Sequence, residues 1–232
     1  MNAKPEDVEE YLKNLGIEYR FGCFSEKRPE VCHLLGDYFE AVSRDFEKAA
    51  KIYRTNCDDY KFARSCHKYG NYGFLGRGGV KKGPDTALEY YAKGCDLDLA
   101  ESCMNGGLLC ALRNPLSPHR ALDLPRGLKL LEKACTLGQG DACYHLSGMY
   151  LTGTEDGTTV PKPDMTRAFQ YSLRACELGN VFACANTSQM YSRGDGVEKN
   201  EQKATEFKAK AEDLHKQLTG KTPGIEFQQG LS

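Results

Sequence analysis

The stretch ACELGNVFAC, residues 175–184, holds two cysteines with seven residues between them, and it returns as ACTLGQGDAC at residues 134–143. Ten of the eleven cysteines fall into five successive pairs, with eight residues between the cysteines in the first two and seven in the others: Cys23 and Cys32, Cys57 and Cys66, Cys95 and Cys103, Cys135 and Cys143, and Cys176 and Cys184. The first cysteines of successive pairs are 34, 38, 40 and 41 residues apart. Because a period of this length is typical of a two-helix solenoid unit, the spacing predicts a repeat protein.

Small residues stand at two fixed places around the cysteine pairs. Eight residues before the first cysteine of the later four pairs are Ala49, Ala87, Gly127 and Ala168, and four residues after the second cysteine of all five pairs are Gly36, Gly70, Gly107, Ser147 and Ser188. Small side chains at fixed places let two helices approach closely. Larger apolar residues between them, such as Leu130 and Leu131, recur at helical spacing. The pattern predicts an all-α fold.

The fifth unit indicates where its helices begin and end. Asp164 is a favourable N-cap, and Gly179 is a favourable C-cap before a second helical stretch. We therefore expect the first cysteine of a pair in the last turn of one helix and the second in the first turn of the next. Residues that face each other across a tight hairpin can meet the Cα separation of about 4.4 to 6.8 Å that a disulfide requires.

The pattern AC-x-L-G-x-x-x-AC, followed by a small residue and MY, resembles the Sel-one-like repeat, a relative of the tetratricopeptide repeat. The cysteine-rich form of this family, with one disulfide in each helix pair, is the nearest form, and the resemblance covers about residues 5–197. It implies a right-handed α–α superhelix of five repeats in a single domain, residues 1–219. The expected segments are repeats at about 5–43, 44–82, 84–121, 123–162 and 164–197, a capping helix at 198–219, and a flexible tail at 220–232.

The whole-chain layout resembles cysteine-stapled members of the family that act in the assembly of cytochrome c oxidase. This resemblance implies a scaffold that promotes biogenesis of respiratory complex IV in the mitochondrial intermembrane space. It also implies copper-delivery metallochaperones or oxidase assembly intermediates as protein partners, and haem as a candidate cofactor. The chain has no C-x-x-C-H motif for covalent haem attachment, and we assign no cofactor-binding residue.

Cysteine usage and charge limit the compartment and the partners. Cytosolic thiols are kept reduced, so regular cysteine pairs predict an oxidising compartment. The first twenty residues have neither a basic flank nor an apolar run, so we expect no secretory signal. The mitochondrial intermembrane space meets both expectations, because cysteine-paired proteins enter it without a cleaved signal and are oxidised there. With 31 basic and 32 acidic residues, the chain lacks the excess of positive charge that nucleic-acid binding requires. We expect no nucleic-acid partner, no membrane span and a monomer.

The residues leave other functions open. A haem-binding thiol–disulfide oxidoreductase that reduces disulfides of those metallochaperones needs one strained or exposed pair, and Cys110 is a redox candidate. Catalytic dithiols favour a C-x-x-C spacing, which the chain lacks, so we lean against an enzyme. Cys110 also shares the repeat slot of Phe39, Tyr150 and Tyr191, which indicates a core position. A generic protein-interaction module, or a secreted binder like bacterial cysteine-rich relatives, is the remaining alternative.

Histidine follows cysteine directly at His33 and His67. The same slot holds Met104, Tyr144 and Ala185 in the other units, which is typical of a tolerant packing position. A zinc site needs four convergent ligands, and the cysteines are better explained as pairs. We therefore expect structural histidines and no metal site.

Overall fold

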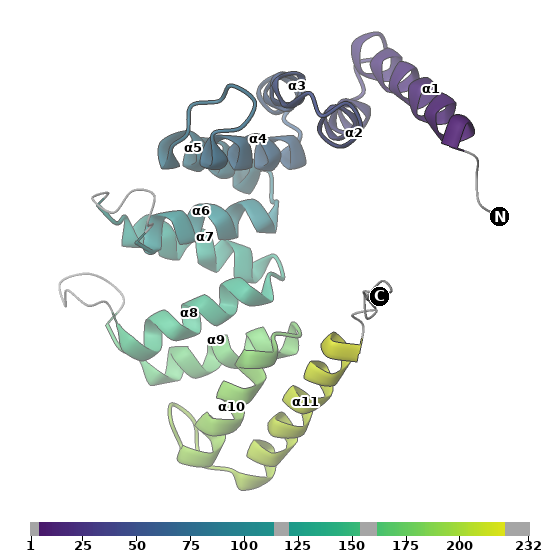
Figure 1. Ribbon diagram of the computed structural model, residues 1–232. Helices are drawn as coiled ribbons and strands as arrows, with labels where there is room; N and C mark the ends of the chain where they lie inside the picture. Colours follow the sequence, from purple (N-terminus) through teal and green to yellow (C-terminus); the bar gives the residue numbers. More distant parts are fainter. Residues whose placement is uncertain (1–4, 114–120, 154–161, 221–232) are drawn as a thin grey trace, which may run out of the picture. The chain divides into compact units, whose positions relative to one another are not determined.

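The computed structural model describes residues 5–113, 121–153 and 162–220, and the tail expected to be flexible lies outside these ranges from residue 221 onward. Within them the chain is all-α, as predicted, with eleven helices and no strand (Figure 1). The helices are α1 Pro5–Phe24, α2 Pro29–Ala41, α3 Phe46–Asp58, α4 Ala63–Leu75, α5 Pro84–Asp96, α6 Ala100–Ala111, α7 Leu124–Thr136, α8 Gly140–Thr152, α9 Met165–Glu177, α10 Val181–Arg193 and α11 Glu201–Gly220. None of the helices in the described ranges combines the length and apolar character needed to span a bilayer.

Contacts group the chain into two compact units, Met1–Leu137 and Gly138–Ser232. In the first unit, α1 to α7 pack in order, each on the helix before and after it in sequence. In the second unit, α8 to α11 pack in the same sequential manner. Each unit is therefore built from neighbouring helices, as expected of a repeat protein. The C-terminal helix expected at 198–219 begins at Glu201 and packs on α10.

Helix ends are set by local side chains and by glycine. The carboxylate of Asp164 accepts a hydrogen bond of 3.0 Å from the backbone N–H of Arg167, which confirms the expected N-cap of α9. Asp45 and Asp123 cap α3 and α7 in the same way. Gly179 follows α9 with a φ of +90°, a conformation that L-residues rarely adopt. The turn at Gly179 brings the end of α9, with Cys176, back toward the start of α10, with Cys184.

The small residues predicted to bring helices together lie between one cysteine-stapled pair and the next. A Cβ atom at Gly107 in α6 would lie 3.1 Å from the carbonyl oxygen of Gly127 in α7. In the second unit, the hydroxyl of Ser147 donates a 2.8 Å hydrogen bond to the carbonyl of Ala168 in α9. The hydroxyl of Ser188 likewise donates to the carbonyl of Ala204, at 2.6 Å. The small slots thus join the second helix of one pair to the first helix of the following pair.

Candidate functional site: buried disulfides and a groove in the first unit

The disulfides join the last turn of one helix to the first turn of the next. The Cα–Cα distances are 4.5 Å for Cys23–Cys32, 4.7 Å for Cys57–Cys66, 4.5 Å for Cys95–Cys103 and 4.5 Å for Cys176–Cys184. Cys135 and Cys143 are disulfide-bonded as well. These distances lie in the range that unstrained disulfides occupy. Each disulfide therefore acts as a staple across a helix hairpin.

The sulfur atoms are shielded from solvent. None of the ten paired cysteines is more than 6% exposed. Disulfide exchange requires a thiolate to reach one of the sulfurs, so burial opposes exchange while the chain stays folded. Cys110 is also a buried thiol, 1% exposed, in an apolar cluster with Leu88, Tyr91 and Leu109. Because apolar burial disfavours the thiolate, this environment gives little support to a redox role for Cys110.

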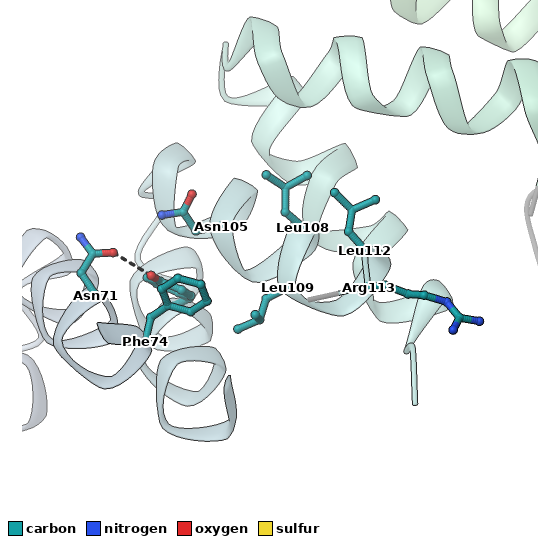
Figure 2. A pocket seen from close by; sticks show the side chains of 8 residues that line it. Asn71, Phe74, Asn105, Leu108, Leu109, Leu112 and Arg113 are labelled. Carbon is teal, nitrogen blue, oxygen red and sulfur yellow. Dashed lines mark hydrogen bonds between the residues drawn. The ribbon is translucent and has the colours of Figure 1, made fainter. Parts of the chain in front are cut away.

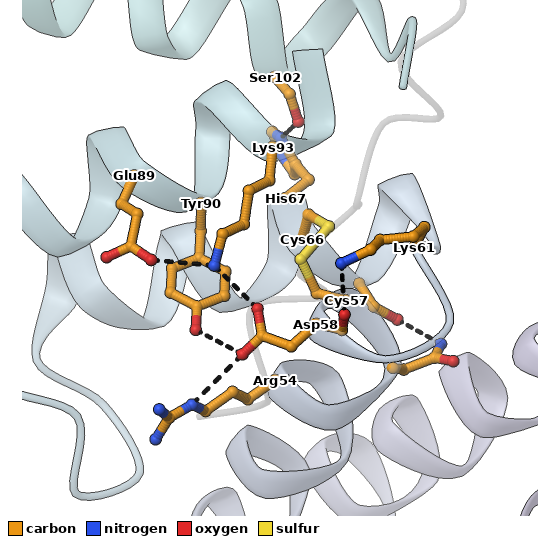
Figure 3. Close-up of a disulfide and its surroundings, with 12 residues drawn as sticks. Arg54, Cys57, Asp58, Lys61, Cys66, His67, Glu89, Tyr90, Lys93 and Ser102 are labelled. Carbon is orange, nitrogen blue, oxygen red and sulfur yellow. Dashed lines mark hydrogen bonds and ion pairs between the residues drawn. A yellow bond between two sulfur atoms is a disulfide. The ribbon is translucent and has the colours of Figure 1, made fainter. Parts of the chain in front are cut away.

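A charged cluster beside the second disulfide links α3 to α5 (Figure 3). Asp58 accepts hydrogen bonds from the hydroxyl of Tyr90 at 2.9 Å and from Nζ of Lys93 at 2.8 Å. Burial raises the pKa of Asp58, but the hydrogen bonds from Lys93 and Tyr90 outweigh burial and lower it below its usual value. The carboxylate is therefore charged at neutral pH, when it ties one helix pair to the next.

The following pair repeats this link. Nζ of Lys133 in α7 donates to the carbonyl oxygen of Cys95 at 2.6 Å and lies 2.8 Å from the carboxylate of Asp98. Lys93 and Lys133 each stand two residues before the first cysteine of their pair, and Arg174 holds the same slot in the fifth repeat. Sequence reasoning missed these links. A basic residue recurring at one offset from the cysteine was the signal that could have found them.

The two histidines beside cysteines connect neighbouring helix pairs. Nδ1 of His33 lies 3.0 Å from the hydroxyl of Ser65, and Nδ1 of His67 lies 3.1 Å from the hydroxyl of Ser102. The ring of His33 also packs against aromatic rings of Tyr53 and Phe62. Burial is the main cause that lowers the pKa of both histidines. These contacts assign them a packing role.

Stability is expected to fall as the pH drops below 6.5, the unperturbed histidine value. Since the folded-state pKa values of His33 and His67 are lowered, the unfolded chain binds more protons in this window. Their contribution is fully present above 6.5 and declines by up to about 1.4 kcal/mol per pH unit for each histidine. Urea unfolding at about pH 7.5 and about pH 5.5 measures the loss. His67→Gln should show a smaller difference between the two pH values; a difference equal to that of the wild type would contradict this assignment.

The two histidines beside cysteines are engaged in packing contacts and do not form a haem or metal site. One ring nitrogen of His33 and one of His67 already contact serine hydroxyls. A hollow of about 370 Å³ between α4 and α6 is lined by no histidine, methionine or cysteine, the residues that most often ligate haem iron. Across residues 5–113, 121–153 and 162–220, no group of three or more His, Cys, Asp or Glu side chains could hold a metal ion. We derive no chemistry through either cofactor.

Two adjoining hollows form a groove on the first unit. The larger, of about 370 Å³, lies between α4 and α6 (Figure 2) and is lined by Asn71, Phe74, Tyr91, Asn105, Leu108, Leu109, Leu112 and Arg113. The smaller, of about 240 Å³, is lined by Glu40, Lys68, Asn71, Tyr72, Phe74, Leu75 and Arg77. Because Asn71 and Phe74 line both, we treat the two hollows as one groove. Its α4–α6 end is mainly apolar and its α2–α4 end is charged.

The charged end of the groove is held in place by ion pairs. Nζ of Lys68 lies 2.8 Å from the carboxylate of Glu40 and 3.3 Å from that of Asp37. Arg77 lies 3.5 Å from Glu40, on its other oxygen. The hydroxyl of Tyr53 donates to Asp37 at 2.6 Å. Two acidic and two basic side chains thus balance one another there, so this end carries no net charge.

This architecture defines a class, the disulfide-stapled helical repeat proteins. The Sel1 repeat family model matches residues 29–55, 63–99, 118–139, 140–180 and 181–214. The chain therefore belongs to the Sel1 repeat family, in the group that includes the cytochrome c oxidase assembly factor 7 proteins. Four of the matches begin where α2, α4, α8 and α10 begin, so the family repeat pairs the second helix of one hairpin with the first helix of the next.

Relatives match over nearly the whole chain. The cytochrome c oxidase assembly factor 7 homolog of Drosophila melanogaster is 45% identical, over 98% of this chain and 96% of that protein. Cytochrome c oxidase assembly factor 7 of Homo sapiens is 39% identical, over 91% of each chain. The crystal structure of a Sel1 repeat protein from Oxalobacter formigenes aligns with a TM-score of 0.71 at 19% identity, over 90% of this chain and 83% of that one. This last likeness concerns the fold alone.

Proposed function

We propose that the protein is a scaffold of the mitochondrial intermembrane space that holds protein partners during the assembly of cytochrome c oxidase. The observation that carries this proposal is identity of 39 to 45% over at least 91% of the chain with relatives named for that assembly. Ten disulfide-bonded cysteines support an oxidising compartment. Copper-delivery metallochaperones and oxidase assembly intermediates are the partners that this role calls for.

A scaffold fits the geometry better than an oxidoreductase does. The paired sulfurs and the Cys110 thiol are buried, so an incoming thiolate has no access to them in the folded chain. The groove of the first unit, by contrast, presents apolar walls beside a fixed ionic cluster, which are features of a binding surface. Protein binding is thus the activity that the described surface supports.

The proposed function is tested by complementation of Drosophila cells that lack the relative named above. Expression of this chain should restore assembled, active cytochrome c oxidase on native gels, and alkylation of intact mitochondria should find the paired cysteines oxidised. Cys110→Ala should restore the enzyme as well as the wild type, since a scaffold needs no reactive thiol. Failure of an oxidised, folded chain to restore the oxidase would refute the role, and failure of Cys110→Ala alone would favour the oxidoreductase.

A further inference from the structure

One tyrosine orients an asparagine side chain in the groove, and a second asparagine lies in the same hollow. The hydroxyl of Tyr91 donates a 2.7 Å hydrogen bond to Oδ1 of Asn71, which is the dashed line at Asn71 in Figure 2. A phenol has a single hydrogen, and Tyr91 gives it to Asn71, while the side chain of Asn105 lines the same hollow. Burial raises the pKa of Tyr91 to about 12, against the smaller opposing effect of Asn105, so the hydroxyl keeps its hydrogen at neutral pH. The amide of Asn71 is therefore held in one defined orientation, with its oxygen bound to Tyr91.

This arrangement leaves one donor and one acceptor unused. The NH₂ group of Asn71 and the carbonyl oxygen of Asn105 form no hydrogen bond within the part of the chain that the structure describes. A side-chain amide can donate two hydrogen bonds and accept two, so both groups have capacity left for a ligand. A donor and an acceptor beside the same hydroxyl match the C=O and N–H of a polypeptide main chain. Apolar walls around them strengthen such bonds.

A buried hydroxyl in the adjoining half of the groove also has no partner. Tyr72 is 2% exposed, and its hydroxyl makes no hydrogen bond to any described residue. Burial is the main cause that raises its pKa, so the hydroxyl remains a donor. Buried polar groups in folded proteins are nearly always satisfied, and one that is not calls for an explanation. Because this hydroxyl is covered in the unbound chain, the side chains over it must move aside before a carbonyl oxygen of a bound chain can supply the missing acceptor.

The groove also selects side chains. Its α4–α6 end has room, at about 370 Å³, for a large aliphatic or aromatic side chain against Phe74 and Leu108. Leu112, 48% exposed, forms part of its lining. Arg113 lines the same end and makes no ion pair with any described residue, so a carboxylate there would find complementary charge. The α2–α4 end is already neutralised by its own ion pairs.

We propose that the groove binds an extended segment of a partner protein by its main chain. Asn71 and Asn105 pair with one peptide unit, and Tyr72 donates to a second carbonyl. The apolar end takes a large aliphatic or aromatic side chain, and Arg113 pairs with an acidic residue next to it. This site deepens the proposed scaffold function, and it rests on that function for its biological role.

Peptides selected from a random phage-displayed library on the oxidised full chain serve as probes, with affinity measured by fluorescence anisotropy. Asn71→Asp keeps an oxygen for Tyr91 but loses the donor, and Asn105→Ala loses the acceptor, so each should weaken binding about tenfold. Asn186→Ala, which changes the Asn105 slot in the fifth repeat, should leave affinity unchanged. N-methylation of the paired peptide amide should weaken binding to the wild type but not to Asn105→Ala.

Tyr72→Phe separates a binding role from a structural one. Removal of a buried hydroxyl without a partner should raise the melting temperature, yet it should weaken peptide binding several-fold. No selected peptide, or peptides equally bound by wild type, Asn71→Asp and Asn105→Ala, would overturn the site. A lower melting temperature with unchanged affinity would overturn the role of Tyr72. The complementation experiment is evaluated separately from peptide binding. If the chain binds peptides but does not restore cytochrome c oxidase, the scaffold function is contradicted. If it restores the oxidase but binds no peptide, this binding site is contradicted.

Discussion

Complete reduction of the disulfides is expected to unfold the chain at physiological temperature. Each cysteine pair is eight or nine residues apart in sequence. In the chain-entropy model, closing such a loop contributes about 2.6 kcal/mol, so five closures contribute at most about 13 kcal/mol. The whole stability of a typical domain is about 5 to 15 kcal/mol, which leaves little once the staples are open. Helix content followed by circular dichroism after reduction in denaturant and refolding, with and without reductant, measures the effect.

A local version of the experiment tests whether each staple acts on its own hairpin. Cys176→Ala combined with Cys184→Ala should lower the stability of α9 and α10 by about 2.6 kcal/mol. Helices of a repeat array contact only their neighbours, so hydrogen-exchange protection in α3 and α4 should be unchanged. Cys110→Ala is the matched control, because it removes a buried cysteine outside the staples. If α9 and α10 show the same hydrogen-exchange protection in the double variant as in the wild type, the disulfide does not stabilise its hairpin and the prediction is wrong.

The helix hairpins could be read from sequence because their determinants are local and repeated. Asp164 and Gly179 mark the ends of α9 by side-chain capping and positive φ, which depend on a few adjacent residues. The core position of Cys110 could also be predicted, because the repeat register places it in the slot of two buried tyrosines. Five independent copies of one pattern made each inference from a single copy stronger.

The groove could not be predicted, because it depends on side chains that differ between repeats. Asn71 occupies the slot of Leu108 and Gly148, so comparison of the repeats shows a variable position rather than a functional one. The link between Asn71 and Tyr91 joins residues twenty positions apart, and its geometry depends on how α4 packs on α5. Tyr72 looks like an ordinary core aromatic until its hydroxyl is found without an acceptor among the described residues. Only tertiary packing reveals these features.

Gly107→Val is expected to destabilise the first unit by about 3 kcal/mol through overpacking. A Cβ atom at Gly107 would lie 2.7 Å from Cγ of Leu131 and 3.1 Å from the carbonyl oxygen of Gly127. Leu131 is fully buried and the carbonyl belongs to the backbone, so neither can move aside and α6 must separate from α7. The midpoint of urea unfolding measures the loss, and an unchanged midpoint would show that these helices do not depend on this close approach.

The matched control is Gly148→Ala, because a Cβ atom there would meet nothing within 4 Å. It should stabilise α8 by about 0.5 to 1 kcal/mol, since alanine is the better helix former.

Comparison of the repeats explains why the position of Gly107 needs glycine. The residue that packs against Gly107 is Leu131, and its equivalents are Tyr53 and Tyr91 in the repeats where glycine also faces it. The equivalent is the small residue Ser172 where Ser147 takes the place of glycine. Glycine is thus required where the facing residue is large. Gly107→Val with Leu131→Ala should therefore lose less stability than the two single losses added together, because the second substitution makes room for the first.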